Sequence, residues 1–247
     1  MASARVELDP RWGGVNGVFG GHVLATLADA AATGVQSARL ASLMVCFVAS
    51  VKPGEAAVET ESLHDGRTAA TTRLTLVQED RVRAHAFAEF FRGTGQTRWT
   101  DRIDLPDRPA AGFEPPDERP GLAFRERFEM VLLERSAPGV TGGAWVRLRE
   151  DPSEVGLASP EAVLAALLDV MPPALYMEPV RPIFVPTLAF AAHFRTDSRV
   201  DPAGWFYLTH RTAWANDQTC IEDAAVHDAE GHLLAQGRQT RTVRWPA

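Results

Sequence analysis

Two short segments far apart in the chain resemble each other, and both have the pattern of a buried helix. Residues 23–29 (VLATLAD) and 163–169 (VLAALLD) share five of their seven residues. Both are apolar on nearly all faces, which is typical of a buried helix rather than an amphipathic surface helix. Each is followed by runs of alternating polar and apolar residues, the period of β-strands. The fold must therefore accommodate a helix followed by strands twice.

The predicted elements follow the same order in both halves. The first helix runs from about His22 to Thr33, before Gly34, a residue common at helix ends. The second begins after Ser159, which can cap its first turn, and stops at Met171 because two prolines follow. The predicted strands are residues 41–51, 56–63, 68–78 and 82–91, and then 187–195, 204–212, 219–227 and 232–243.

The last predicted strand of each half supports a duplication. Small or apolar residues occupy alternate positions of both strands, so each set faces one side of its sheet. Between the halves, residues 93–120 contain five prolines, which is typical of an extended, poorly hydrogen-bonded linker. We predict an α+β protein of two repeats, residues 1–92 and 121–247, with curved antiparallel sheets around central helices. The aligned strand positions are Val82, Ala84, Ala86 and Ala88 with Leu233, Ala235, Gly237 and Gln239.

Composition and charge exclude several classes of partner. The 247-residue chain has a formal net charge of -7 and no block rich in lysine or arginine, so we expect no nucleic-acid partner. Cys46 and Cys220 are far apart and lie in apolar or β-like contexts, which favours buried free thiols in a reducing compartment. We find no signal-peptide pattern and no run of about 20 apolar residues. We therefore expect a cytoplasmic protein without a membrane partner.

Asp169 is the most suggestive polar residue. It falls in the predicted last turn of an apolar helix, the unfavourable end of the helix dipole for a carboxylate. Burial there would raise its pKa, and such a carboxylate is often a general base or orients a water. The alternative is a side chain that points into solvent or caps a loop N–H.

Gln239 lies on the small, apolar face of the last predicted strand. A buried amide needs partners for its oxygen and its nitrogen, so a structural hydrogen bond to loop backbone and a role in a site are both open. The first half keeps the acid as Asp29 but has Ala88 where Gln239 stands. If a site needs both groups, only the second half can form it.

The sequence gives no support for a phosphate-binding loop, a serine nucleophile elbow or a metal site. The glycine-rich residues 13–31 (GGVNGVFGGHVLATLADAA) lack the GK[ST] ending of a phosphate-binding loop and a clear preceding strand. A G-x-S-x-G nucleophile elbow is missing, which excludes the usual α/β serine hydrolase. Residues 227–232 (HDAEGH) contain metal-ligating types, but a polar hairpin turn explains them, and we expect no metal.

The chain resembles the double-hotdog acyl-CoA thioesterase family, of the acyl-CoA thioesterase II type. The N-terminal motifs are GVFGGHVLATLADAA and FVASVKPGEAAVETESLHDGRTAATTRLTLVQEDRVRAHAFAEF. The C-terminal motifs are LLDVMPPAL, VPTLAFAAHF and CIEDAAVHDAEGHLLAQGRQTRTV. The resemblance covers nearly the whole chain outside the linker. It implies an α+β double hotdog, in which each repeat has a central helix wrapped by a curved antiparallel sheet.

The resemblance also implies a catalytic set. Asp169 matches the family's acid in LLDVMPP, Thr187 its hydroxyl in VPTLAF, and Gln239 its amide in AQGRQT. Thr187 rests on the resemblance alone, because its own periodicity does not single it out. In the glycine-rich opening, His22 replaces the family's usual glutamine.

We expect hydrolysis of acyl-CoA, or a similar pantetheine thioester, by a water that these three residues activate, without a cofactor. Gly20, Gly21 and His22 would present backbone N–H groups to the thioester carbonyl. One alternative is a hotdog hydratase or dehydratase that uses His193, and another is an acyl-thioester-binding protein without turnover. We also expect a homo-oligomer, because such open sheets often pair edge to edge.

Overall fold

The computed structural model describes residues 2–35, 37–93, 95–108, 122–133, 142–177, 180–197 and 199–246. The helices in these ranges are α1 (Gly20–Thr33) and α2 (Pro160–Leu168), with short 3-10 turns at Pro10–Trp12, Ala123–Arg127, Pro152–Val155 and Ala174–Met177. The strands of the first half are β1 (Ala2–Leu8), β2 (Arg39–Phe47), β3 (Gly54–Asp65), β4 (Ala69–Gln78) and β5 (Arg81–Phe91). Those of the second half are β6 (Phe128–Leu132), β7 (Gly142–Leu148), β8 (Thr187–Phe194), β9 (Phe206–Ala215), β10 (Thr219–His227) and β11 (Leu233–Thr242).

The expectation of two buried thiols is wrong for Cys46, which is exposed on β2, whereas Cys220 on β10 is buried.

The predicted helices and strands are all present, with shifted ends. The predicted end of the second helix at Met171 is wrong, because α2 ends at Leu168 and Asp169 is its C-cap residue. Pro172 has no N–H to bond the carbonyl of Leu168, so the regular helix cannot continue to Met171. Strands β1, β6 and β7 were not predicted. Most of β1 is exposed, so its sequence lacks a buried face to reveal it.

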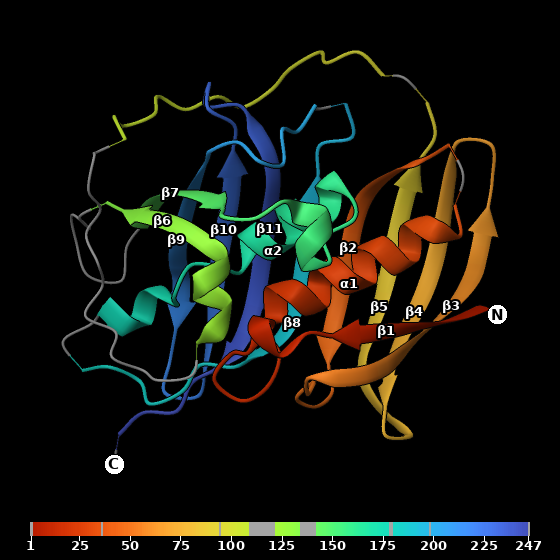
Figure 1. The fold of residues 1–247 in the computed structure, drawn as a ribbon. Helices are drawn as coiled ribbons and strands as arrows, with labels where there is room; N and C mark the ends of the chain where they lie inside the picture. Colours follow the sequence, from red (N-terminus) through yellow and green to blue (C-terminus); the bar gives the residue numbers. More distant parts are fainter. Residues whose placement is uncertain are drawn as a thin grey trace.

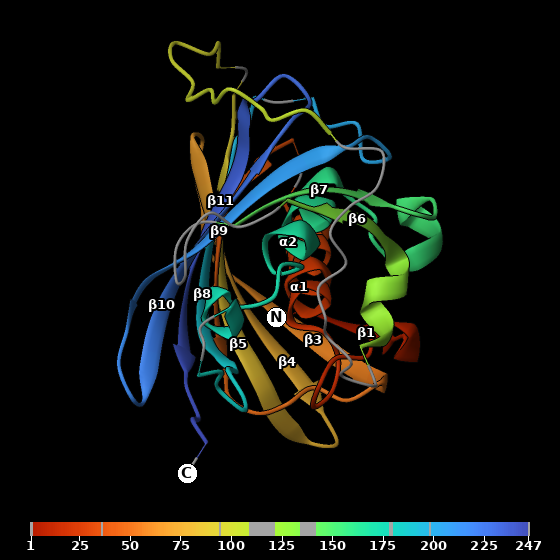
Figure 2. The same ribbon diagram turned by 90° about the vertical axis from the view of Figure 1, so that its left-hand side faces the viewer.

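The strands form one antiparallel sheet in the order β1-β3-β4-β5-β2-β8-β11-β10-β9-β7-β6. The two halves of the chain meet at its centre, where β2 pairs with β8 and Met44 lies opposite Ala191. Figure 1 shows residues of the first half on one side of this seam and residues of the second half on the other. The sheet curves around α1 and α2, which lie side by side on its concave face (Figure 2).

Both helices are buried, as their all-round apolar sequences predict. Every residue of α2 from Ala162 to Leu168 is buried. Ser159 caps α2, since its Oγ accepts a hydrogen bond of 3.1 Å from the N–H of Ala162. The core between helices and sheet continues from one half of the chain to the other. The C-terminal end of α2 is thereby held at a fixed place above the central strands.

Part of the predicted linker is bound to the second half rather than free. The N–H of Ile103 donates to the carbonyl of Gly231, and Arg102 bridges to His232. Trp145 Nε1 donates to the carbonyl of Pro106 at 3.2 Å. The expectation of a poorly hydrogen-bonded segment is therefore wrong for residues 102–106. Residues 109–120 of the predicted linker lie outside the described residues.

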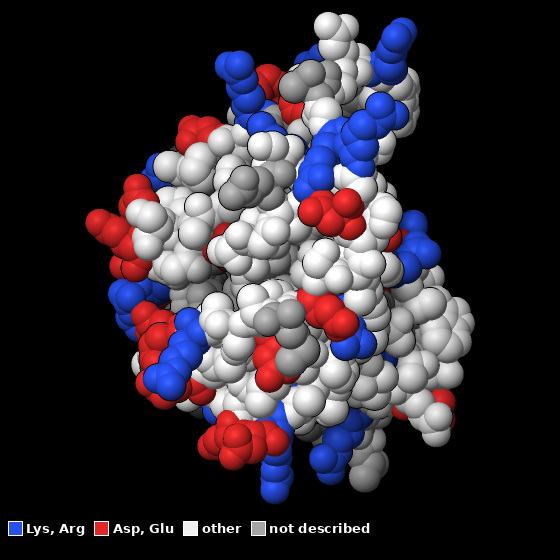
Figure 3. All heavy atoms as spheres, turned by 90° about the vertical axis from the view of Figure 1, so that its right-hand side faces the viewer, with Lys and Arg blue, Asp and Glu red and all other residues white. Residues whose placement is uncertain are grey.

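The molecular surface near the edge strand β1 and its neighbour β3 carries mixed charges. Figure 3 shows acidic and basic side chains interspersed with uncharged ones on this face. Charged side chains at an edge strand disfavour pairing with another chain. In the described part of the chain, neither helix is long and apolar enough to span a membrane.

Candidate active site

Asp169, Thr187 and Gln239 lie together at one end of α2. Gln239 Nε2 donates a hydrogen bond of 3.1 Å to Asp169 Oδ1. Thr187 Oγ1 donates one of 2.8 Å to Gln239 Oε1. The amide is therefore oriented at both ends, and a hydroxyl, an amide and a carboxylate form one chain of hydrogen bonds.

Thr187 reaches this chain because β8 contains a bulge. Phe190, Ala192 and Phe194 are buried, so the even-numbered residues of β8 face the core. The pairing with β11 shifts register between Thr240 and Arg241, which leaves Leu188 without an opposite residue. A bulge reverses the alternation beyond it. Thr187 therefore turns inward to Gln239, while Leu188 is exposed.

Two charged residues that sequence reasoning missed complete the surroundings of Asp169. Arg241 Nη2 donates to Asp169 Oδ1 at 3.0 Å, and Arg241 Nε lies 2.7 Å from Glu222 Oε2. Glu222 is fully buried, and its Oε1 accepts hydrogen bonds from the N–H of Ala174 and the hydroxyl of Thr212. Both charged residues share the buried alternation of their strands, Arg241 with Gln239 and Glu222 with Cys220. A charged residue at a buried alternate position of a strand is therefore the sequence signal that could have identified them.

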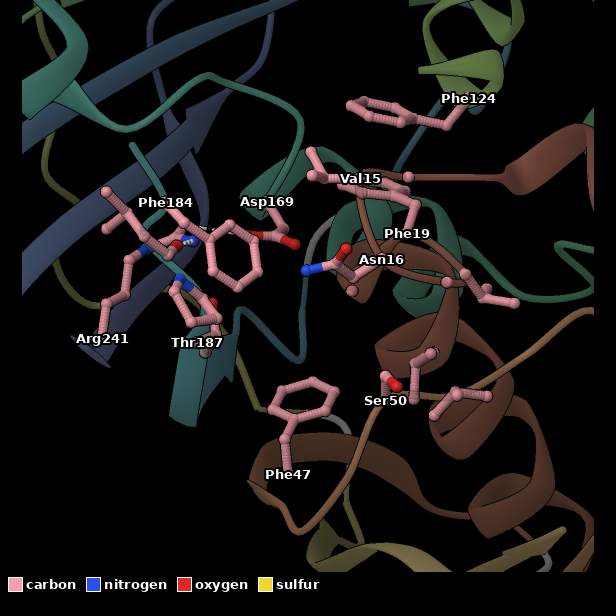
Figure 4. A pocket seen from close by; sticks show the side chains of 18 of the residues that line it. Val15, Asn16, Phe19, Phe47, Ser50, Phe124, Asp169, Phe184, Thr187 and Arg241 are labelled. Carbon is pink, nitrogen blue, oxygen red and sulfur yellow. Dashed lines mark hydrogen bonds and ion pairs between the residues drawn. The ribbon is translucent and has the colours of Figure 1, made fainter. Parts of the chain in front are cut away.

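A cleft of about 580 Å³ opens beside these residues. Asp169, Thr187 and Arg241 line it, whereas Gln239 lies behind them and is only 1% exposed. Figure 4 shows the Asp169 carboxylate pointing into the cleft, with Asn16 across from it. Much of the wall is apolar and comes from both halves of the chain, including Phe19, Phe47, Phe124, Met171, Phe184 and Leu188.

Asp169 lies against the N-terminus of α1. A Cβ placed on Gly20 would come within 2.7 Å of Asp169 Oδ2. The N-terminus of a helix carries partial positive charge, which compensates for the unfavourable position of this carboxylate at the end of α2. Burial raises the pKa of Asp169, while the charge of Arg241 and the hydrogen bonds from Gln239 and Arg241 act in the opposite direction.

Asp29 occupies the reciprocal position at the other end of the helix pair. Its Oδ2 accepts a hydrogen bond of 2.8 Å from the N–H of Ala158, next to the N-cap residue of α2. Burial raises the pKa of Asp29, and hydrogen bonds from Ser159 and Ala158 oppose that rise. Ala88 is fully buried and supplies no polar group. Asp29 therefore has a structural role at the start of α2.

The three residues expected to bind the thioester carbonyl separate in the structure. Gly20 lines the cleft, but Gly21 and His22 do not. A Cβ on Gly21 would lie 2.7 Å from the carbonyl of Ala166, so this glycine allows the two helices to approach closely. His22 is buried and stacks on Trp12 with ring centroids 4.6 Å apart. Burial lowers the pKa of His22 to about 4, so it is neutral at pH 7.

Two other candidate residues or groups lie away from the cleft. His193 is exposed on the outer face of β8, because it alternates with the buried Ala192 and Phe194. The β10–β11 turn brings ligand atoms of Asp228, Glu230 and His232 within 4.8 Å of one another. Asp228 Oδ1 accepts hydrogen bonds from the N–H groups of Glu230 and His232, so this cluster is an ordinary side-chain-stabilised turn.

Solved structures with the same fold include the following three. A conserved protein with a hot dog fold from Alicyclobacillus acidocaldarius is 20% identical, with a TM-score of 0.83, over 99% of this chain and 94% of that one. Acyl-CoA thioesterase II TesB2 from Mycobacterium marinum is 22% identical, with a TM-score of 0.75, over 99% and 94%. The tesB protein of Mycobacterium avium subs paratuberculosis is 18% identical, with a TM-score of 0.77, over 99% and 93%. No curated protein matches the chain.

The fold and its neighbours define an α+β protein of the hotdog class. Residues 8–91 match the acyl-CoA thioesterase N-terminal domain, and residues 83–243 match the acyl-CoA thioesterase C-terminal domain. The chain belongs to the acyl-CoA thioesterase family. The family resemblance read from the sequence motifs is thereby confirmed.

Proposed function

We propose that the protein hydrolyses acyl-CoA, or a similar pantetheine thioester, to a free acid and a thiol. The observation that carries this proposal is the hydrogen-bonded chain Thr187–Gln239–Asp169, whose carboxylate opens into an apolar cleft. An apolar wall suits an acyl chain, and a carboxylate beside a hydroxyl suits a nucleophilic water. The family membership supports the same chemistry.

In the proposed mechanism, one water binds between Asp169 Oδ2 and Thr187 Oγ1. Thr187 donates its own hydrogen to Gln239, so its oxygen accepts a hydrogen bond from the water. Asp169 Oδ2 removes a proton as the water oxygen attacks the thioester carbonyl carbon. The tetrahedral intermediate then collapses, the C–S bond breaks, and the proton on Asp169 passes to the thiolate sulfur. The carbonyl oxygen, negatively charged in the intermediate, would face the α1 N-terminus at Gly20.

The direct test replaces Asp169 with asparagine and measures thiol release from acyl-CoA substrates. Loss of a general base lowers the rate by about 10²- to 10⁴-fold, so we expect a loss of that size for Asp169→Asn. Asp29→Asn is the matched control, because Asp29 lies at the other end of the helix pair and outside the cleft. Near-wild-type thiol release by Asp169→Asn in a folded protein would refute the proposed role.

The two alternatives from the sequence have separate tests. A hydratase or dehydratase that used His193 would need that residue in the cleft, and His193 faces the outside of the sheet. An enoyl-CoA hydration assay, which changes absorbance without releasing thiol, distinguishes this reaction. An acyl-binding protein without turnover would bind acyl-CoA tightly and release no thiol at high enzyme concentration.

We also propose that the chain consists of two hotdog repeats, residues 1–92 and 121–247. The reciprocal placement of Asp29 and Asp169 supports this proposal, since Asp29 lies in the C-terminal part of α1 at the start of α2, and Asp169 ends α2 at the start of α1. The helix and the strands that follow it have the same order in both halves. On this reading, the first repeat has lost the amide that a second site would need, because Ala88 stands in its place.

A further inference from the structure

The guanidinium of Arg241 lies between two buried carboxylates. Its Nη2 donates to Asp169 Oδ1 at 3.0 Å, and its Nε lies 2.7 Å from Glu222 Oε2. The side chains of Arg241, Asp169 and Glu222 are 7%, 10% and 0% exposed. Arg241 Nη1 also donates to the carbonyl of Val185 at 3.3 Å. Both Nη atoms therefore donate hydrogen bonds, and Nε forms an ion pair.

Such a cluster is costly to bury, because each charge must leave water. Two buried carboxyl groups share one guanidinium, so a single positive charge faces both of them beside the cleft. Apolar residues of similar volume would fill the same space without this desolvation cost. A structural role alone does not explain why charged residues occupy it, whereas control of the neighbouring Asp169 does.

The two carboxylate oxygens of Asp169 have different surroundings. Oδ1 accepts hydrogen bonds from Gln239 and Arg241, whereas Oδ2 lies at the α1 N-terminus on the cleft side. Arg241 thus fixes the rotation of the carboxylate. Its positive charge also favours the ionised form, which is the form that can remove a proton from water.

Glu222 has two opposing effects. It holds Arg241 in place, because its Oε1 is anchored by Ala174 and Thr212 while its Oε2 faces the guanidinium. Its negative charge, however, disfavours a second negative charge on Asp169. Two further titratable groups lie near this cluster: His210 on β9, 3.5 Å from Glu222, and the buried Cys220 on β10.

We propose that Arg241, held by Glu222, is a positioning residue that directs Oδ2 of Asp169 toward the cleft and favours the ionised form of this carboxylate. The proposal rests on the proposed thioesterase function. It assigns no contact with the reacting atoms to Arg241, which acts through Asp169.

The test measures kcat/KM against pH for the wild type and for variants of opposite expected effect. On the acidic limb of this profile, kcat/KM falls as the pH is lowered and Asp169 becomes protonated. Arg241→Met removes the positive charge, so the acidic limb moves to higher pH, by about one to three pH units. Glu222→Gln removes a negative charge, so the limb moves to lower pH. Arg241→Lys keeps the charge without the planar guanidinium, so the limb stays near its wild-type position while kcat falls.

Arg238→Met is the matched control. Arg238 lies on the same strand with its side chain on the outer face, where it pairs with Asp223. This variant loses an arginine and an ion pair but leaves the acidic limb in place. A merely structural role for Arg241 would lower kcat and thermal stability without moving the limb in opposite directions for Arg241→Met and Glu222→Gln. Limbs that stay fixed, or that both move in one direction, overturn the proposal.

A second measurement separates this proposal from the proposed function. The carboxyl carbon of Asp169 can be followed by ¹³C NMR during a pH titration, with its resonance assigned by its loss in Asp169→Asn. If the wild type releases no thiol, the proposed function fails, and the titration still tests Arg241. If Arg241→Met does not fold, Glu222→Gln tests the effect of charge and Arg241→Lys the effect on kcat, and an unshifted Asp169 titration in Glu222→Gln overturns the proposal.

Discussion

At the scale of single residues, the missing Cβ of Gly20 determines how closely Asp169 can approach α1. Its missing side chain leaves room for Asp169 Oδ2, and a Cβ there would come within 2.7 Å of that oxygen. Gly20 is the first residue of α1 and its φ is not positive, so the backbone conformation itself does not require glycine. Glycine is therefore required here by the nearby Asp169 carboxylate and not by the helix backbone.

Gly20→Ala is expected to reduce thiol release by at least about tenfold while the free energy of unfolding changes little. The new methyl group displaces the Asp169 carboxylate, and small displacements of catalytic groups can cost about 10²-fold in rate. Gly34→Ala is the control, because a Cβ at Gly34 meets only the carbonyl of Ala31 at 4.0 Å. Steady-state kinetics and urea unfolding of both variants check this, and equal activity of the two would contradict it.

At the scale of elements, the start of α1 is held by stacked rings. His22 lies face to face with Trp12, which stacks in turn near Phe19. Trp12 Nε1 donates to the carbonyl of Val155, just before α2. This cluster therefore connects the beginnings of both helices, and its imidazole is neutral at pH 7.

The folded protein is expected to lose stability as pH falls, because His22 is buried without charge. Burial lowers the pKa of His22 to about 4, whereas it titrates near 6.5 in the unfolded chain. The unfolded state therefore binds the proton first. Its contribution lowers the free energy of unfolding progressively between pH 6.5 and 4, by roughly 3 kcal/mol in total.

Urea unfolding of the wild type and of His22→Phe, at several pH values in this window, measures the effect. Phenylalanine keeps a ring against Trp12 but cannot titrate, so its stability should depend less on pH. Parallel stability curves for the two proteins would show that His22 does not titrate on unfolding.

The helices and most strands could be predicted from the sequence because their periodicity reflects burial. Gln239 was identified in the same way, and Arg241 and Glu222 could have been, since both lie on buried alternations. Thr187 could not be found from periodicity, because the bulge at Leu188 reverses the face on which it lies. Gly20 and His22 separate because α1 begins at Gly20 rather than near His22, and residues two apart on a helix do not face the same side.

At the scale of the whole molecule, the two halves are joined by more than the covalent chain. Strands β2 and β8 pair at the centre of the sheet, and the core runs through both halves. The cleft takes Asp169 and Thr187 from one half and Phe19 and Phe47 from the other. Neither half alone therefore forms the complete lining of the cleft.

A protease site inserted within residues 109–120 should allow the chain to be cut without separating the halves. The β2–β8 pairing and the packed helices should hold the fragments together, and thiol release should persist in the cut protein. Size-exclusion chromatography with light scattering, before and after cleavage, measures this and also tests the expected homo-oligomer. Fragments that elute apart without denaturant would contradict the prediction.

The reciprocal acids Asp29 and Asp169 have a consequence for how such a chain can evolve. Each acid lies at the beginning of the other half's helix, so a change at either helix start alters the surroundings of an acid in the other half. Substitutions in one half are therefore constrained by the sequence of the other. The halves can diverge only as co-adapted partners, and exchanging one of them for the equivalent half of a distant relative would disturb the cleft even if both halves fold.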